Sequence, residues 1–400
     1  MLHRVIKQLH QSVWLAIWLL VSVFLFSVLY QYQISRGCWL GEWPFETGCE
    51  AGMPTGFIGK ETADVYEQHL IKNPGHSLAY AWLALDRLEP GINDKTLEYL
   101  KSAMQTAPAN EQVLLVQADI SLKNQEWLEA AKALVTLIQL GNKNAREPFL
   151  QLLSYQPTQQ SALSLITADS VWLDKLLRGA DSKFAINGLL PAFSHGKKLG
   201  LISADTTVSV IDKLMASGQW FEAYGMWVDY HGTLKNGLFN TGFDTPISQK
   251  GFDWKWSQSK DLRKTMVIKQ VAAHTDNGMM LELEFLGRKA IPLPMVHQIV
   301  ILHHDEYVFS GSYYADRLEA NEGLSWKFSC ASGSDPWAQT EALLDTQKQW
   351  KSFELRLKIP AACGTAVRVG LETKSAGDAR VGITGLVQFD RLALTRADKQ

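Results

Sequence analysis

An uninterrupted apolar run extends from Val13 to Tyr30, in which Ser22 and Ser27 are the polar residues and no side chain is charged. As a helix, these eighteen residues would rise roughly 27 Å, close to the hydrocarbon thickness of a bilayer. A soluble surface helix of this length would have a polar face, and this run has none. The sequence therefore predicts a transmembrane helix over residues 13–32.

The charges that flank the run predict its orientation. Arg4 and Lys7 precede it, whereas acidic residues follow Arg36 at Glu42, Glu46 and Glu50. Because basic flanks stay in the cytoplasm, residues 1–12 are expected to be a cytoplasmic N-terminus. The chain beyond the helix, beginning with a linker over residues 33–59, is expected on the far side of the membrane.

A cleaved secretory signal is the alternative interpretation of this run. The apolar core of such a signal is about 7–15 residues long and ends at an Ala-x-Ala-like site. This run is longer, and no such site follows it. Cys38 follows Ser-Arg-Gly, which lacks the aliphatic residue of a lipoprotein signal. An uncleaved anchor is therefore favoured.

Composition narrows the classes of function. A length of 400 residues with 46% hydrophobic content is sufficient for two cores beyond the anchor. A charged fraction of 20% with 10% aromatic residues is typical of a folded chain. The net charge of -2 provides no basic field for a phosphate backbone, so no nucleic-acid partner is expected.

The four cysteines form two local pairs, Cys38 with Cys49 and Cys330 with Cys363. An even number of cysteines in local pairs, on a chain expected outside the cytoplasm, favours the disulfides Cys38–Cys49 and Cys330–Cys363. Four free buried thiols are the alternative. Neither pair has CxxC spacing, so the sequence predicts no zinc site.

Residues 60–233 have helical periodicity and an internal repeat. Pro74 and Pro108 end matching turns 34 residues apart, and two apolar helices follow each of them. Thirty-four residues is the period of tetratricopeptide repeats, which stack into scaffolds with a concave binding surface. Gly218–Tyr224 resembles the turn and second helix of a further, degenerate unit, although the register blurs after residue 142. An ordinary helical bundle is the alternative to this all-α, tetratricopeptide-like domain.

In residues 234–398, short runs in which apolar and polar residues alternate with a period of two are separated by turn residues. This pattern predicts an all-β sandwich of the jelly-roll type. In Leu324–Cys330, the residues Leu324, Trp326 and Phe328 alternate onto one face. Cys330 would then point inward, towards Cys363.

Short motifs in this region resemble those of jelly rolls of the carbohydrate-binding-module type. Gly237–Asp244 (GLFNTGFD) is similar to their first-strand NxGFE motif. Weaker matches follow it, at Gly251–Trp254, Tyr307–Ser310, Trp350–Phe353 and Phe389–Leu392. The order of anchor, helical repeats and sandwich resembles accessory proteins of exopolysaccharide and O-antigen assembly in Gram-negative bacteria. This resemblance implies an anchor in the bacterial inner membrane and a periplasmic body.

The resemblance also implies candidate metal ligands. In the family, an acidic residue of the first motif and an Asp of the last strand sometimes hold a structural calcium ion. Asp244 and Asp390 occupy these positions, with Asp244 one carbon shorter than the usual Glu. Hard oxygen ligands suit Ca²⁺. Solvated or capping carboxylates are the alternative, and no other cofactor is expected.

Sugar binding requires aromatic faces that are exposed beside polar side chains. Trp256, Tyr314 and Trp337 have polar neighbours and outward positions in the strand alternation, so they are the candidate glycan-binding residues. Core positions remain the alternative for each. Three other tryptophans are expected in the core, namely Trp254, Trp326 and Trp350.

No catalytic residue is predicted. The densest titratable cluster is His303–Glu306, where adjacent side chains would point to opposite faces, as at a polar hairpin tip. The sequence lacks the nucleophile-elbow, zinc-protease, P-loop and dinucleotide motifs.

These features predict a non-enzymatic periplasmic scaffold or adaptor in surface-polysaccharide biosynthesis or export. Its helices would dock protein partners, and its sandwich would contact glycan or a partner. The alternatives are a glycan-modifying lyase or hydrolase, and a general assembly factor for envelope proteins.

Overall fold

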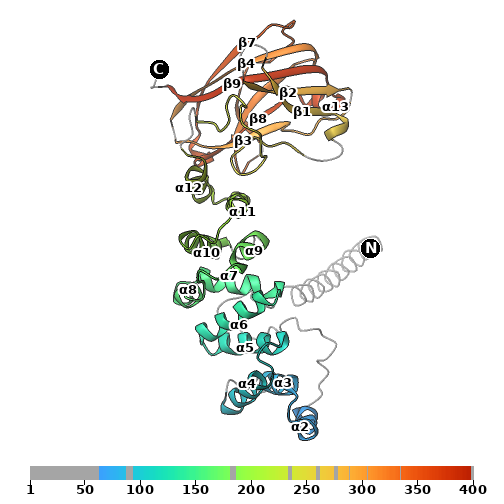
Figure 1. Cartoon of the computed structure of the whole chain (residues 1–400). Helices are drawn as coiled ribbons and strands as arrows, with labels where there is room; N and C mark the ends of the chain where they lie inside the picture. The colour runs from blue at the N-terminus through green and yellow to red at the C-terminus, as the bar shows by residue number, and fades with distance from the viewer. Residues whose placement is uncertain are drawn as a thin grey trace, which may run out of the picture. The chain divides into compact units, whose positions relative to one another are not determined.

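A computed structural model gives the fold of the chain (Figure 1). It describes residues 63–86, 93–180, 186–232, 237–257, 262–273, 278–287, 289–303, 305–333 and 335–397. The predicted membrane helix over 13–32 and the Cys38–Cys49 pair lie outside the described residues. Within the described ranges, no helix is both long and apolar enough to cross a membrane. The chain divides into two compact units between Leu201 and Ile202.

The described part of the first unit is all-α. Its described helices are α2 (Ala63–Lys72), α3 (Ser77–Asp86), α4 (Asp94–Thr106), α5 (Glu111–Lys123), α6 (Trp127–Gln139), η1 (Lys143–Ala145), α7 (Arg146–Ser154), α8 (Gln156–Leu163), α9 (Trp172–Gly179) and α10 (Ile186–Lys198). Ser77 and Glu111, the first residues of α3 and α5, are 34 positions apart, as the repeat predicts. Small and branched residues fill the space between these helices, including Ala84 and Ala103. The predicted helical region is therefore confirmed, while its assignment as tetratricopeptide remains a prediction.

The second unit begins with two helices, α11 (Ala204–Ala216) and α12 (Trp220–His231). Their connecting turn repeats the one between α5 and α6. In each turn the last residue, Glu126 or Gln219, donates its N–H to a helix carbonyl five positions earlier. The residue before it has a left-handed φ, 59° at Gln125 and 78° at Gly218. The degenerate unit expected at Gly218–Tyr224 is thus a helical hairpin of the same kind.

This hairpin packs against the β-rich part of its own unit. Trp227 of α12 is buried, and its ring centroid lies 5.0 Å from that of Phe239. A Cβ at Gly251 would lie 2.3 Å from the Trp227 ring, so only glycine allows this approach. The helical hairpin ends at His231, and the first strand begins at Met266. The division between compact units falls before the hairpin, because the burial of Trp227 joins α12 to the sandwich.

The strands form two antiparallel sheets. Their bounds are β1 (Met266–Ala272), β2 (Met279–Leu286), β3 (Val296–Ile301), β4 (Glu306–Glu319), β5 (Leu324–Cys330), β6 (Pro336–Gln339), β7 (Lys351–Lys358), β8 (Ala366–Thr373) and β9 (Thr384–Arg396), with short helices η2 (Leu262–Lys264), η3 (Ala361–Cys363) and α13 (Ala376–Val381) between them. The five-stranded sheet has the order β1-β2-β9-β4-β7, and the four-stranded sheet has the order β3-β8-β5-β6. The predicted antiparallel β architecture is confirmed.

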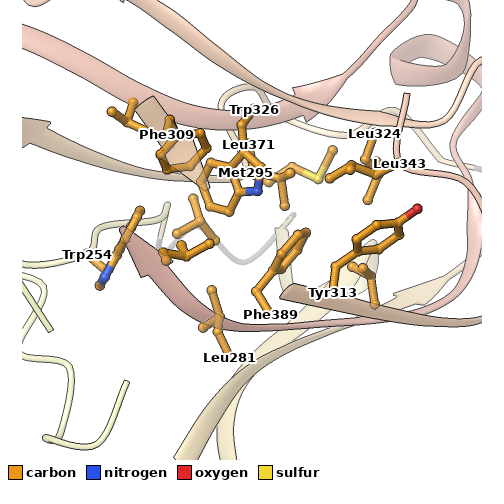
Figure 2. Close-up of a cluster of buried hydrophobic side chains, with 14 of the residues drawn as sticks. Trp254, Leu281, Met295, Phe309, Tyr313, Leu324, Trp326, Leu343, Leu371 and Phe389 are labelled. Atoms are coloured by element: carbon orange, nitrogen blue, oxygen red, sulfur yellow. The ribbon is translucent and has the colours of Figure 1, made fainter. Parts of the chain in front are cut away.

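Side chains from both sheets meet in one core (Figure 2). Trp326 of β5 lies at its centre, with its ring centroid 5.2 Å from Phe389 of β9 and 5.7 Å from Trp254. Both tryptophans are fully buried, which confirms their predicted core positions. The predicted disulfide Cys330–Cys363 is also present and joins the end of β5 to η3.

Candidate functional site

Five side chains form a row across the outer face of the five-stranded sheet, called the outer row below. They are Lys269 on β1, Glu282 on β2, Gln388 on β9, Tyr314 on β4, and Trp350 directly before β7. The strand register places the first four opposite one another in succession, strand by strand. Directly opposed residues share a face of a sheet, and their strand neighbours, such as Phe389, lie in the core. The outer row therefore faces away from the core.

The centre of the outer row is a hydrogen-bonded polar group. Lys269 Nζ lies 2.9 Å from Glu282 Oε1, and Gln388 Nε2 donates to Glu282 Oε2 at 2.6 Å. The hydrogen bond to Glu282 raises the pKa of Lys269 above its ordinary value. Glu282 is 7% exposed and Gln388 is 5% exposed, so both are nearly buried on the outer face of a sheet. Each oxygen of the carboxylate has a donor.

The amide of Gln388 is left with one unused acceptor. A carboxylate only accepts hydrogen bonds, so the amide must turn its NH₂ group towards Glu282. Its Oε1 is buried and has no hydrogen-bond partner among the residues that the structure describes. A buried acceptor without a partner costs about 1–3 kcal/mol. A ligand that donates a hydroxyl to Oε1 would remove this cost.

An aromatic pair closes the row at the β7 side. The ring centroids of Tyr314 and Trp350 are 5.9 Å apart, and Trp350 is 38% exposed. The prediction that Trp350 fills the core is wrong. It directly precedes β7, the last strand in the order of the five-stranded sheet, and lies opposite Tyr314 on the face away from the core. Aromatic rings of this kind offer flat apolar surface to a ligand.

Short polar and charged side chains border the row. Ser312 of β4 is opposite Ser352 of β7 on the same face. On the other side, Asp316 Oδ2 lies 3.6 Å from Lys348 Nζ. The outer row therefore consists of an aromatic pair and a polar centre, and side chains that can form hydrogen bonds border it.

The structure separates the three predicted glycan-binding residues. Tyr314 belongs to the outer row. Trp256 is half-buried in a loop beside β3, and its neighbour Lys255 pairs with His297 of that strand. Trp337 lies on β6, where its ring centroid is 5.9 Å from that of Phe328. Trp256 and Trp337 thus belong to the four-stranded side, and Trp350 takes the place beside Tyr314.

The two predicted calcium ligands do approach each other. A Cβ at Gly242 would lie 2.7 Å from Asp244 Oδ2 and 3.9 Å from Asp390 Oδ1. Asp244 Oδ1 already accepts the N–H of Met279 at 2.9 Å. Across the described part of the chain, no group of three His, Cys, Asp or Glu side chains could hold a metal. The two carboxylates fit part of the six to eight oxygen ligands that Ca²⁺ prefers, so the calcium site stays a prediction.

No family model matches the sequence, and no curated protein matches it. Among solved structures, the C-terminal sandwich is similar to several carbohydrate-binding modules. TmCBM61 in complex with β-1,4-galactotriose is 18% identical, with a TM-score of 0.28, and the match covers 41% of this chain and 99% of that one. A CBM4 structure is 17% identical, with a TM-score of 0.30 and coverages of 40% and 99%. The CBM22-1 xylan-binding domain of Xyn10C from Paenibacillus barcinonensis is 15% identical, with a TM-score of 0.26 and coverages of 41% and 97%.

Proposed function

We propose that the outer row is a glycan-binding surface. A sugar ring presents C–H groups on its faces and hydroxyls around its edge. The Tyr314–Trp350 pair would take a ring face, and the polar centre would take hydroxyls. A sugar chain can run across the row because its side chains come from five successive positions of the sheet.

The observation that carries this proposal is the unpaired Oε1 of Gln388 beside an exposed aromatic pair. Gln388 is directly opposite the half-buried Tyr314 in the register of β4 and β9. A small movement of the Tyr314 side chain would admit a hydroxyl. The ligand would then donate to Gln388, which no other group does in the described structure.

The proposed role of the whole chain is non-enzymatic. It would be a scaffold or adaptor in surface-polysaccharide assembly, anchored in the bacterial inner membrane with its body in the periplasm. The apolar run Val13–Tyr30 supports the anchor, and Cys330–Cys363 suits an oxidising compartment. The paired helices α3–α6 would dock protein components, and the outer row would hold the glycan.

Binding of the full-length chain to immobilised neutral polysaccharides of the host envelope tests the outer row. The double variant Tyr314→Ala/Trp350→Ala should weaken binding by about tenfold or more, which corresponds to about 1.4 kcal/mol. Phe221→Ala removes an exposed aromatic ring on α12 and is the matched control. Equal affinity of the double variant and the control would contradict the proposal.

Topology and process are tested in cells. A phosphatase that is active only outside the cytoplasm, fused after residue 400, should be active. Deletion of the gene should change the amount or chain length of surface polysaccharide. An inactive fusion would contradict the periplasmic location, and unchanged polysaccharide would contradict the assembly role.

A further inference from the structure

An open hollow of about 770 Å³, called the cavity below, lies beside β3, on the four-stranded side of the sandwich. Its lining residues are Ser248, Gln249, Lys255, Trp256, Ser257, Pro292, Leu293, Pro294 and His297. None of them belongs to the outer row. The volume is within the range of small-ligand pockets, about 300–1,000 Å³.

One wall of this cavity is apolar and fixed in place. Trp256 is half-buried and packs against the core, so its ring is held from behind. Pro294 packs closely over Gly370, where an added Cβ would lie 2.9 Å from Pro294 Cβ. Pro292 and Leu293 extend the wall. A flat, rigid ligand surface would pack well here.

The loop that forms the other wall is also held in place. Asp212 Oδ1 of α11 accepts the N–H of Gly251 at 2.8 Å and lies 3.0 Å from Lys255 Nζ. Asp253 Oδ2 accepts both the N–H and the hydroxyl of Ser248. The cavity is therefore preformed, and a ligand need not order its loop on binding.

The polar groups at the cavity carry little free charge. Among the lining residues, Lys255 is the one with a permanent charge, and Asp212 neutralises it. Burial, together with the positive charges of Arg368 and Lys255, lowers the pKa of His297 to about 4, so the imidazole is neutral at pH 7. Its Nδ1 is buried without a hydrogen-bond partner among the described residues. The cavity therefore offers uncharged donors and acceptors beside an aromatic wall.

We infer that this cavity is a second ligand site, which takes a single uncharged, polyhydroxylated ring such as one neutral sugar unit. The ring face would stack on Trp256, and its hydroxyls would bond to Gln249 and His297. An anionic sugar would find no unpaired cation among the lining residues. The site does not depend on the outer row, which lies on the other sheet.

Saturation-transfer NMR of the full-length chain tests the inference, with three separate probes. Methyl β-D-glucopyranoside and methyl β-D-galactopyranoside are the neutral probes, and the methyl glycoside of glucuronic acid is the anionic one. At least one neutral probe should bind, and Trp256→Ala should weaken it by about tenfold. Trp350→Ala should leave that binding unchanged, because Trp350 is in the outer row.

Trp256→Ala removes a ring that contacts the core, so His297→Phe provides a second variant of the same cavity. It should also weaken the neutral probe, and near-ultraviolet circular dichroism should show that it is folded. Absence of binding by both neutral probes overturns the inference. Binding of the glucuronoside as tightly as the neutral probes, or more tightly, also overturns it. So does binding of the neutral probe that is lost in Trp350→Ala but kept in His297→Phe. If only the outer row fails to bind glycan, His297→Phe should still weaken binding of the neutral probe.

Discussion

Two rows of polar side chains on the outer faces of the sandwich complete their hydrogen bonds differently. On the four-stranded sheet, Lys327 Nζ lies 3.2 Å from Glu372 Oε2, and Arg368 donates to Ser329 Oγ and to the carbonyl of Gly333. These groups, called the paired row below, are satisfied among themselves. On the five-stranded sheet, the outer row leaves Gln388 Oε1 without a partner and ends in an exposed aromatic pair.

This difference distinguishes polar side chains that only stabilise the fold from polar side chains that could bind a ligand. A charged or polar side chain on a sheet face signals little by itself, because neighbouring residues can satisfy it. An acceptor held in place, nearly buried and unpaired, has a free-energy cost that a ligand can relieve. The paired row should therefore affect folding, and the outer row should affect binding.

The largest expected effect is on the stability of the four-stranded layer. Replacing both cysteines, Cys330→Ala with Cys363→Ala, removes a disulfide that spans 33 residues of sequence. The free energy of unfolding should fall by about 3–4 kcal/mol through the gain of chain entropy in the unfolded state. Denaturant titration measures it, and a fall below about 1 kcal/mol would contradict the prediction.

The next effect is the pH dependence contributed by His297. The pKa of this histidine is about 4 in the folded chain, against 6.5 for an ordinary histidine, so the folded state binds the proton more weakly than the unfolded state. The stability that neutral His297 contributes is complete above pH 6.5. It is lost as the pH falls towards 4, by about 3 kcal/mol in total. His297→Phe should lose less stability than the wild type between pH 7 and pH 4.5. Parallel losses in urea titrations at the two pH values would refute this assignment.

A smaller effect is expected at the polar centre of the outer row. Gln388→Met keeps the shape of the side chain but removes the acceptor and the donor to Glu282. Glycan affinity should fall about tenfold. The unfolding free energy should change by less than about 1 kcal/mol, because the loss of the hydrogen bond to Glu282 is offset by removal of the unpaired acceptor. Calorimetric titration and denaturation measure the two quantities. Unchanged affinity would remove Gln388 from the site.

The smallest effect is expected in the paired row. Lys327→Met breaks the pair with Glu372, of which both side chains are partly exposed. Stability should fall by about 1 kcal/mol, and glycan affinity should not change. A loss of affinity here as large as that of Gln388→Met would erase the distinction between the two faces.

Periodicity predicted much of the fold but little of the outer row. Alternation in Leu324–Cys330 correctly placed Trp326 in the core and Cys330 within reach of Cys363. Alternation does not predict that Ser325, on the opposite face, is fully buried. Its hydroxyl donates to the carbonyl of Thr340, which lies in the segment after β6.

The outer row depends on pairing that a single sequence does not reveal. Glu282 and Gln388 touch across a separation of 106 residues. Trp256 and Trp337 are outward by pattern, yet Trp337 lies on β6 of the other sheet and Trp256 lies in a loop beside β3. Trp350 had a usable signal, since counting back by twos from Ser352 places it on the outer face.

The attachment of α11 and α12 determines how this chain can be shortened. A fragment that begins after α12 would lack Trp227, so Phe239 and Phe252 would lose their packing partner and become exposed to solvent. It would also take away Asp212, which anchors the backbone at Gly251. Such a truncated piece would be prone to aggregate, whereas one beginning near Ile202 would retain its own apolar cover.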